Sequence, residues 1–208
     1  MKQTIEIFAG TKSFSKVAEE RGYKTLTIDN EESLNPDVVT DILNYDPGEA
    51  WFMWFSPPCT GFSVASIGRH WEKDTREPKT DTARLGIKLL ERTAFLIAKN
   101  KPKYWCIENP RGMFRKIAPQ ILRKHGLTEW RRTTVSYCQY GDKRMKPTDI
   151  FTNILNWEGK CCKNGNPCHE PAPRGSKAET QGIKNAKLRG VIPPALFEEI
   201  FEIIENGN

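Results

Sequence analysis

The chain has 208 residues, of which 38% are hydrophobic and 10% aromatic. These proportions are typical of one globular domain with a sizeable core and exclude a disordered chain, and no apolar run reaches the roughly 18 residues that span a bilayer. The net charge is +6, and the basic excess between positions 99 and 144 suits a polyanion such as nucleic acid, although solvated helix faces explain it equally well.

The N-terminal pattern predicts a strand, a turn, a helix and a second strand. Residues 4–8 alternate, residues 14–18 have helical spacing, and Gly22 stands where a helix C-cap belongs. A second strand at 25–28 closes at Asp29. This unit is typical of the opening of a nucleotide-binding α/β fold. Because no signal-peptide core precedes it, we expect an intracellular protein whose six cysteines are thiols or metal ligands.

The aromatic run at 51–55 predicts a short buried strand at the centre of the fold. Pro57 and Pro58 end this strand and fix the backbone, so Cys59 leaves the sheet on a rigid turn. Ligands bind at the carboxyl ends of strands in open α/β sheets, and a thiol placed there is a candidate nucleophile. The alternative is a loop cysteine without chemistry.

A long helix is expected next, capped by Asp81 or Thr82 and burying Leu85, Leu89 and Leu96. The composition then changes between 156 and 182, where an irregular insertion is expected. The other predicted elements are a strand at 104–107 ending in Glu108, a helix at 113–124, a strand at 133–138 and a final helix starting at Pro193–Pro194.

Several short motifs follow one another along the chain. They are Phe8-Ala9-Gly10, Asp29, Asp41-Ile42, Pro57-Pro58-Cys59 with Phe62-Ser63, Glu108-Asn109-Pro110, Gln139-Tyr140-Gly141-Asp142-Lys143, and Ile192-Pro193-Pro194. In this order they resemble the motifs of the DNA (cytosine-5)-methyltransferases, specifically their short phage-type members, and the motif at Gln139 corresponds to the family's Gln-x-Arg-x-Arg. Thr11-Lys12-Ser13 departs from the pattern where the family has more glycine, and Gly141 and Lys143 replace its two arginines.

The resemblance implies a Rossmann-like class I fold that uses S-adenosyl-L-methionine. It further implies one catalytic domain, with a core of 1–151 and 183–208 and a small recognition-like insertion at 152–182 in place of a full target-recognition domain. The implied reaction is methylation of cytosine carbon 5 in duplex DNA by a monomer that does not bind membranes.

The implied chemistry begins when Cys59 adds to carbon 6 of a flipped-out cytosine. Glu108 would hold ring nitrogen 3, and Lys143 would contact oxygen 2 and lower the thiol pKa. The candidate cofactor contacts are Phe8, Gly10, Ser13, Asp29, Asp41 and Pro57, although Asp29 could serve only as a turn residue and Asp41 as a helix cap. The candidate nucleic-acid contacts are Arg111, Lys143, Arg144, Arg174, Ser176 and Gln181.

Cys161, Cys162, Cys168 and His169 offer four zinc ligands within nine residues, but the spacing is not that of a standard finger, and free thiols in a polar loop are the alternative. Two other functions stay open. The same chemistry could act on RNA, or the fold could be a non-catalytic nucleic-acid-binding module. The presence of both Cys59 and Glu108 argues against the module, which needs neither.

Overall fold

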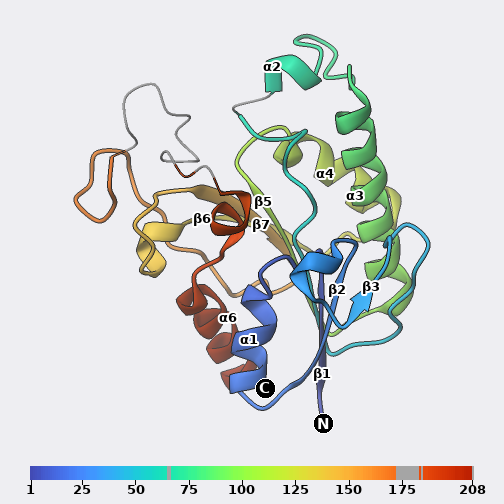
Figure 1. Cartoon of the computed structure of the whole chain (residues 1–208), viewed down its shortest axis with the longest axis vertical. Helices are drawn as coiled ribbons and strands as arrows, with labels where there is room; N and C mark the ends of the chain where they lie inside the picture. The colour runs from blue at the N-terminus through green and yellow to red at the C-terminus, as the bar shows by residue number, and fades with distance from the viewer. Residues whose placement is uncertain (65–66, 172–182, 184, 208) are drawn as a thin grey trace.

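The computed structural model describes residues 1–64, 67–171, 183 and 185–207. It has three layers, with one seven-stranded sheet between two helical layers (Figure 1). The elements, in chain order, are β1 Gln3–Ile7, α1 Ser13–Glu20, β2 Lys24–Asp29, η1 Glu32–Leu34, β3 Val38–Val39, β4 Phe52–Phe55, α2 Ile67–His70, α3 Asp81–Asn100, β5 Tyr104–Pro110, α4 Phe114–Lys124, β6 Arg131–Ser136, η2 Tyr137–Tyr140, β7 Pro147–Thr152, α5 Ala186–Gly190 and α6 Pro194–Asn206.

The strand order of the sheet is β3-β2-β1-β4-β5-β7-β6. Strands β1 to β5 are parallel, and β7 is antiparallel to both β5 and β6. The order reverses between β1 and β4, and in such sheets the crevice at the carboxyl ends of the two reversing strands binds ligands. The loops that follow β1 and β4 therefore lie where a cofactor and a substrate can meet.

The predicted central strand is confirmed as β4, and all four of its residues are buried. Phe52 and Trp54 pack in the core on the side of α1 and α6, while Met53 and Phe55 pack in the core on the side of α3 and α4. Full burial of side chains of this size stabilises the fold by about 1.5–3 kcal/mol each. This double-sided packing fixes the strand that carries the Cys59 loop.

The predicted long helix is confirmed as α3, but its cap and one buried position differ from the prediction. The side chain of Thr80, rather than Asp81 or Thr82, caps the helix by accepting from the Ala83 N–H at 3.3 Å. Leu85 was expected in the core and is 49% exposed. The helix meets the sheet with a neighbouring stripe of residues that includes Leu89, Leu90, Leu96 and Ile97.

In the second half, β5 continues through Pro110, so Glu108 lies inside a strand rather than just beyond its end. Strand β7 was not predicted. It inserts between β5 and β6, and Thr148 to Thr152 are all buried. Pro147 and Asp149 resemble turn residues in sequence, which conceals the strand. Within the described part of the chain, no helix is both long and apolar enough for a membrane crossing.

Candidate active site

The Cys59 loop is held rigidly against the start of α4. The Cys59 carbonyl accepts from the Phe62 and Ser63 N–H groups at 2.9 and 3.0 Å, which closes a tight turn. The Phe62 ring is fully buried, and its carbonyl accepts from the Met113 N–H at 2.7 Å. Gly112 allows this close approach, because a Cβ there would lie 2.0 Å from the Phe62 oxygen. The half-buried Cys59 thiol is therefore presented by a backbone with little freedom.

Glu108 lies next to this loop on β5, which is the parallel neighbour of β4. Its side chain is 6% exposed and accepts at Oε1 from the Tyr137 hydroxyl at 3.0 Å. The Asn109 amide donates to the Pro57 carbonyl at 2.9 Å and ties β5 to the Cys59 loop. Burial raises the pKa of the Glu108 carboxyl, and the Lys146 charge and the Tyr137 hydrogen bond oppose this effect. A carboxyl with a raised pKa is suited to donating a proton near neutral pH.

The cation next to the thiol and the carboxyl is Lys146. Its side chain is 8% exposed, and Nζ lies 4.5 Å from the centroid of the Tyr137 ring. Burial lowers the pKa of the Lys146 ammonium, while the negative charges of Glu108 and Cys59 raise it. The ammonium is therefore within electrostatic range of both groups that were predicted to be catalytic.

Lys143, which was predicted for this place, points elsewhere. Its side chain is 82% exposed and pairs with Glu170 at 3.2 Å. The chain turns at Gly141, which has a φ of +86°, and this turn carries Lys143 to the surface. The predicted catalytic role of Lys143 therefore lacks structural support.

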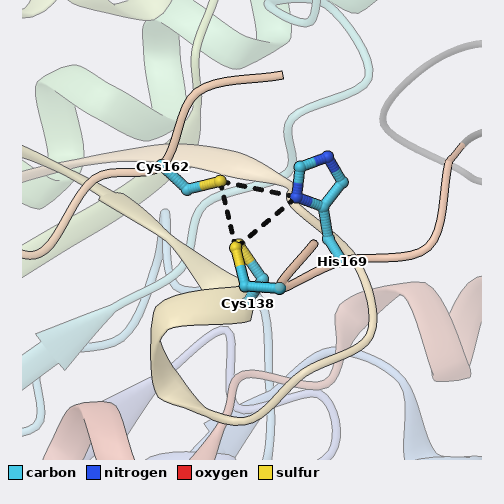
Figure 2. Close-up of side chains that lie close together, drawn as sticks. Cys138, Cys162 and His169 are labelled. Carbon is cyan, nitrogen blue, oxygen red and sulfur yellow. Dashed lines mark hydrogen bonds between the residues drawn. The ribbon is translucent and has the colours of Figure 1, made fainter. Parts of the chain in front are cut away.

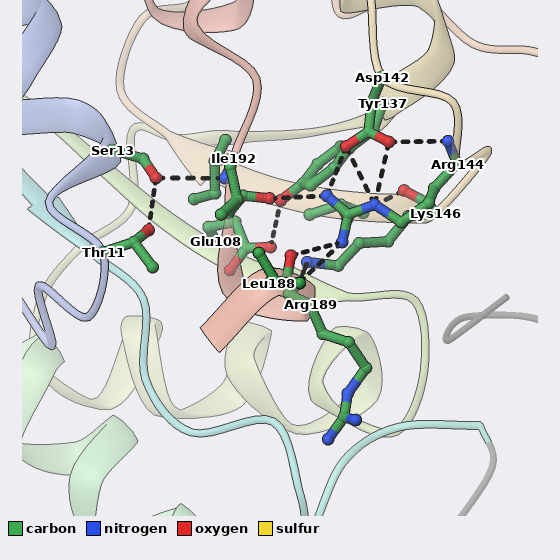
Figure 3. A network of polar contacts seen from close by, with 12 residues as sticks. Thr11, Ser13, Glu108, Tyr137, Asp142, Arg144, Lys146, Leu188, Arg189 and Ile192 are labelled. Carbon is green, nitrogen blue, oxygen red and sulfur yellow. Dashed lines mark hydrogen bonds and ion pairs between the residues drawn. The ribbon is translucent and has the colours of Figure 1, made fainter. Parts of the chain in front are cut away.

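Arg144 was predicted to contact DNA, but the structure buries it. Its guanidinium is paired with Asp142 and donates to the carbonyls of Leu188, Arg189 and Val191 at 3.0–3.2 Å. Lys146 Nζ adds a bond to the Arg189 carbonyl at 3.0 Å. Figure 3 shows these contacts converging near Glu108. Arg144 therefore organises the site from inside, because its donors are engaged and only 6% of the residue is exposed.

These positions correct the register of one motif. The spacing Gln-x-Arg-x-Arg is reproduced by Asp142-Lys143-Arg144-Met145-Lys146, with Asp in place of Gln and Lys in place of the second Arg. The register that begins at Gln139 put Gly141 and Lys143 at the two basic positions. The signal in the sequence was the pair of basic residues two apart, Arg144 and Lys146, and both point inward in the structure.

The predicted cofactor loop has an unusual backbone. Phe8, Gly10 and Lys12 have φ values of +59°, +49° and +57°, a left-handed conformation that is rare for phenylalanine and lysine. The loop is tied to β2 because Asp29 Oδ2 accepts from the Gly10 N–H at 2.9 Å. The Asp29 carboxylate retains further acceptor capacity for a ribose. The loop and Asp29 therefore fit a nucleoside cofactor.

The other predicted cofactor residues lie at the same edge of the sheet or support it. The Ser13 hydroxyl shares a hydrogen bond with Thr11 at 2.8 Å and accepts from the Ile192 N–H at 3.2 Å. Asp41 is exposed and closes its own turn after β3 by accepting from the Leu43 N–H at 3.0 Å. The helix-cap interpretation is wrong, because no helix lies between β3 and β4, a stretch that the structure describes in full. Pro57 is buried beside Cys59.

Glu6 was missed as a residue of this region. It is fully buried on β1 and accepts from the Phe14 and Ser15 N–H groups at 3.3 and 2.9 Å, so it caps the start of α1. Burial raises the pKa of Glu6 to about 7, although these hydrogen bonds oppose the shift. No signal in the sequence indicated this burial, because the alternation of residues 4–8 places Glu6 on the polar face of the strand.

The predicted nucleic-acid contacts are only partly described. Arg111 follows β5 and is exposed, as Lys143 is. The predictions for Arg174, Ser176 and Gln181 fall outside the described residues. The predicted metal group is changed, because Cys138 joins Cys162, Cys168 and His169 (Figure 2). The Cys161 thiol donates to the Thr134 carbonyl at 2.7 Å instead.

The sheet order, the strained loop after β1 and the acidic end of β2 define a class I methyltransferase architecture. Two solved structures share it with a TM-score of 0.52 and 14% identity each. One is a prophage-encoded E. coli chain described as a DNA modification methyltransferase, of which 46% is matched by 73% of this chain. The other is S. pombe Dnmt2 methyltransferase, of which 52% is matched by 76% of this chain. The present chain thus spans about half the length of each, and the predicted fold class is confirmed.

A Frog virus 3 (isolate Goorha) protein named "Probable DNA (cytosine-5)-methyltransferase" is 29% identical to this chain over an alignment of 227 positions, gaps included, and the alignment covers 96% of this chain and 98% of that protein. No protein-family model matches the chain. The predicted resemblance to the DNA (cytosine-5)-methyltransferases is confirmed, and the fold is that of the class I methyltransferases. S-adenosylmethionine is the cofactor expected for this fold.

Proposed function

We propose that the chain methylates carbon 5 of cytosine in duplex DNA through a covalent bond between Cys59 and carbon 6 of the base. The observation that carries the proposal is the grouping of a half-buried thiol and a buried carboxyl at neighbouring strands around Lys146. The name of the Frog virus 3 relative supports the substrate and the position of methylation.

Cysteine attack solves the main chemical difficulty, because carbon 5 of cytosine is a poor nucleophile. When the Cys59 thiolate bonds to carbon 6, the electrons of the 5,6 double bond move into the ring, and carbon 5 becomes enamine-like. S-adenosylmethionine would supply an electrophilic methyl group. Loss of the carbon 5 proton to solvent then returns electrons to the ring, and the bond between sulfur and carbon 6 breaks.

Glu108 is placed to stabilise the negative charge that attack sends to ring nitrogen 3. A protonated carboxyl can donate to that nitrogen, and burial raises the Glu108 pKa in the required direction. Tyr137 fixes the carboxyl through its 3.0 Å hydrogen bond. We assign these two residues to acid catalysis and to positioning, respectively.

Lys146 has two roles in the proposed reaction. Its positive charge stabilises the Cys59 thiolate, which is the reactive form of the thiol. It can also donate one charged hydrogen bond to the base, where an arginine would offer two. Since this ammonium is buried, its interaction with developing negative charge is stronger than it would be in water.

The target base must leave the duplex to reach Cys59, because a thiolate adds to carbon 6 from the face of the ring, and stacked neighbouring bases cover that face. Exposed Arg111 and Lys143 are the described candidates for contacts to phosphate. Asp29 and the left-handed loop from Phe8 to Lys12 would hold the nucleoside part of the cofactor. We expect the protein to act inside cells, where both DNA and this cofactor are found.

The test is incubation of the full chain with unmethylated duplex DNA, a matched RNA and labelled S-adenosylmethionine, followed by base-resolution mapping of 5-methylcytosine. We expect methylation of DNA at a short recurring site. Cys59→Ser should lower turnover by more than the 10²–10⁴ that acid–base help alone supplies. Cys161→Ser is the matched control, since that thiol binds a backbone carbonyl outside the site.

Each result bears on a separate part of the proposal. Methylation of RNA alone would reject the DNA substrate but keep the chemistry. Turnover by Cys59→Ser within about tenfold of the parent chain would reject covalent catalysis. Absence of any methyl transfer to either substrate would favour a nucleic-acid-binding module.

A further inference from the structure

Outside the proposed active site, one group of side chains has the composition of a metal site. The Sγ atoms of Cys138, Cys162 and Cys168 and a ring nitrogen of His169 all lie within 4.8 Å of one another. Figure 2 shows the labelled side chains turned toward a common point. They come from η2, from the segment after β7 and from the turn that follows it.

The spacing of the ligand atoms agrees with a tetrahedron. A zinc ion with bonds of about 2.3 Å to sulfur and 2.0–2.1 Å to nitrogen separates two sulfurs by roughly 3.8 Å and sulfur from nitrogen by roughly 3.6 Å. The Sγ of Cys168 lies 3.3 Å from that of Cys162 and 3.7 Å from that of Cys138. His169 Nδ1 lies 3.4 Å from Cys162 Sγ and 3.7 Å from Cys168 Sγ.

A disulfide does not account for this arrangement. The closest pair of sulfurs, in Cys162 and Cys168, is 3.3 Å apart, whereas a disulfide bond is about 2.05 Å long. A disulfide would also use only two of the three thiols and would not involve His169. Three thiols and an imidazole that converge within one small sphere match the Cys₃His set of structural zinc sites.

Backbone hydrogen bonds bring the segments together independently of the thiols. The Ser136 N–H donates to the Lys160 carbonyl at 2.9 Å, and the Cys162 N–H donates to the Ser136 hydroxyl at 3.0 Å. On the other side, the Glu170 N–H donates to the Lys143 carbonyl at 2.9 Å. The cluster is thus enclosed between two backbone connections to the β6–η2 region.

One neighbour supports the proposed ligands, and another is excluded from them. The Gln139 amide donates to Cys168 Sγ at 3.2 Å, a contact that helps hold a thiolate in place as outer ligand partners do. Cys161, although adjacent to Cys162, directs its thiol to the Thr134 carbonyl at 2.7 Å. The chain therefore supplies four ligands, the number that a closed zinc site requires.

We propose that Cys138, Cys162, Cys168 and His169 bind one structural zinc ion. The ion would cross-link the segment after β7 to η2, and its first ligand follows Tyr137, the residue that positions Glu108. Binding would release thiol protons, as metal coordination by cysteine does. The proposal concerns stability and positioning, and it holds whether or not the proposed methylation does.

The first experiment measures metal in the full chain purified without chelator. We expect about one zinc ion per chain. Cys162→Ser and His169→Ala should each lose most of it, while Cys161→Ser should keep it, since it removes a thiol at the adjacent position. Zinc well below stoichiometry in the parent chain, or equal loss in Cys161→Ser, would overturn the proposal.

A second experiment avoids the risk that a ligand variant fails to fold. The metal is removed from the parent chain by a chelator, and Co²⁺ is then added. We expect intense visible absorption typical of tetrahedral thiolate coordination, and displacement of Co²⁺ by Zn²⁺. Weak octahedral absorption, or a disulfide between Cys162 and Cys168 found by mass spectrometry of alkylated native protein, would reject the site.

Discussion

Replacing Gly112 by alanine should impair catalysis although glycine has no side chain that could take part in the reaction. A Cβ at this position would lie 2.0 Å from the Phe62 carbonyl oxygen, and contacts become ordinary only from 3.4 Å, so the two backbones must separate by about 1.4 Å. Phe62 belongs to the turn whose N–H groups bind the Cys59 carbonyl. A displacement of about 1 Å in a catalytic group costs on the order of 10²-fold in rate.

The same change should also lower stability, but only moderately. Overpacking lowers the free energy of unfolding by about 1–3 kcal/mol. Weakening of the 2.7 Å hydrogen bond from the Met113 N–H to the Phe62 carbonyl accounts for about 1 kcal/mol of this loss. For a domain of this size, 1 kcal/mol corresponds to roughly 2–4 °C in Tm. Gly112→Ala should therefore remain folded at assay temperature, and its rate loss should exceed what unfolding explains.

The assay pairs initial rates of methyl transfer with thermal unfolding. Gly68→Ala is the matched control, because a Cβ at Gly68, on α2, would meet no atom within 4 Å. Its rate and Tm should stay close to those of the parent chain. If Gly112→Ala keeps its rate within about threefold, the inference that this contact positions Cys59 is refuted.

Two further predictions concern pH. Lys146→Met should raise the pKa of Glu108, because the Lys146 charge lowers it. The alkaline limb of the pH–rate profile should therefore move to higher pH. An unmoved limb would show that the Lys146 charge does not act on Glu108. Glu6 has a pKa of about 7 in the fold against 4.5 as its usual value, so its contribution to stability is complete below pH 4.5 and is lost as pH rises through 7. Glu6→Gln should therefore gain up to about 3 kcal/mol relative to the parent chain above pH 7, and parallel Tm profiles at pH 5 and pH 8.5 would contradict this.

The first half of the fold was predictable because its signals are local. The apolar run at 51–55 contains the fully buried strand β4, and Gly22 adopts the positive φ that its place after α1 requires. Strand β7 has no comparable signal. Its pairing depends on β5 and β6, which are distant in sequence, and Pro147 at its start resembles a turn. The prediction that Leu85 is buried was wrong because helical spacing alone does not give the width of the buried stripe on a helix.

Within the site, motif residues that follow a strand were predicted, and residues brought in by tertiary turns were not. Cys59 and Glu108 lie on loops or strands whose positions follow from the parallel sheet. Lys146 faces them only because the chain reverses at Gly141. Cys138 was overlooked as a metal ligand because it belongs to a different segment from Cys162, and the bonds of Ser136 to Lys160 and to Cys162 bring the two segments together.

The stretch from Leu188 to Ile192 connects both halves of the proposed reaction. On the target side its carbonyls accept from Arg144 and Lys146, and on the cofactor side the Ile192 N–H donates to Ser13 (Figure 3). Hydrogen bonds from charged donors contribute about 1.5–3 kcal/mol each, so this connection is stronger than ordinary loop contacts. Methyl transfer requires the base and the methyl donor to be aligned to within about an ångström. A single backbone segment bonded to both sides restricts how far the base and the methyl donor can move apart. The buried Arg144 contributes to this restriction because its guanidinium binds the carbonyl oxygens of the segment instead of DNA.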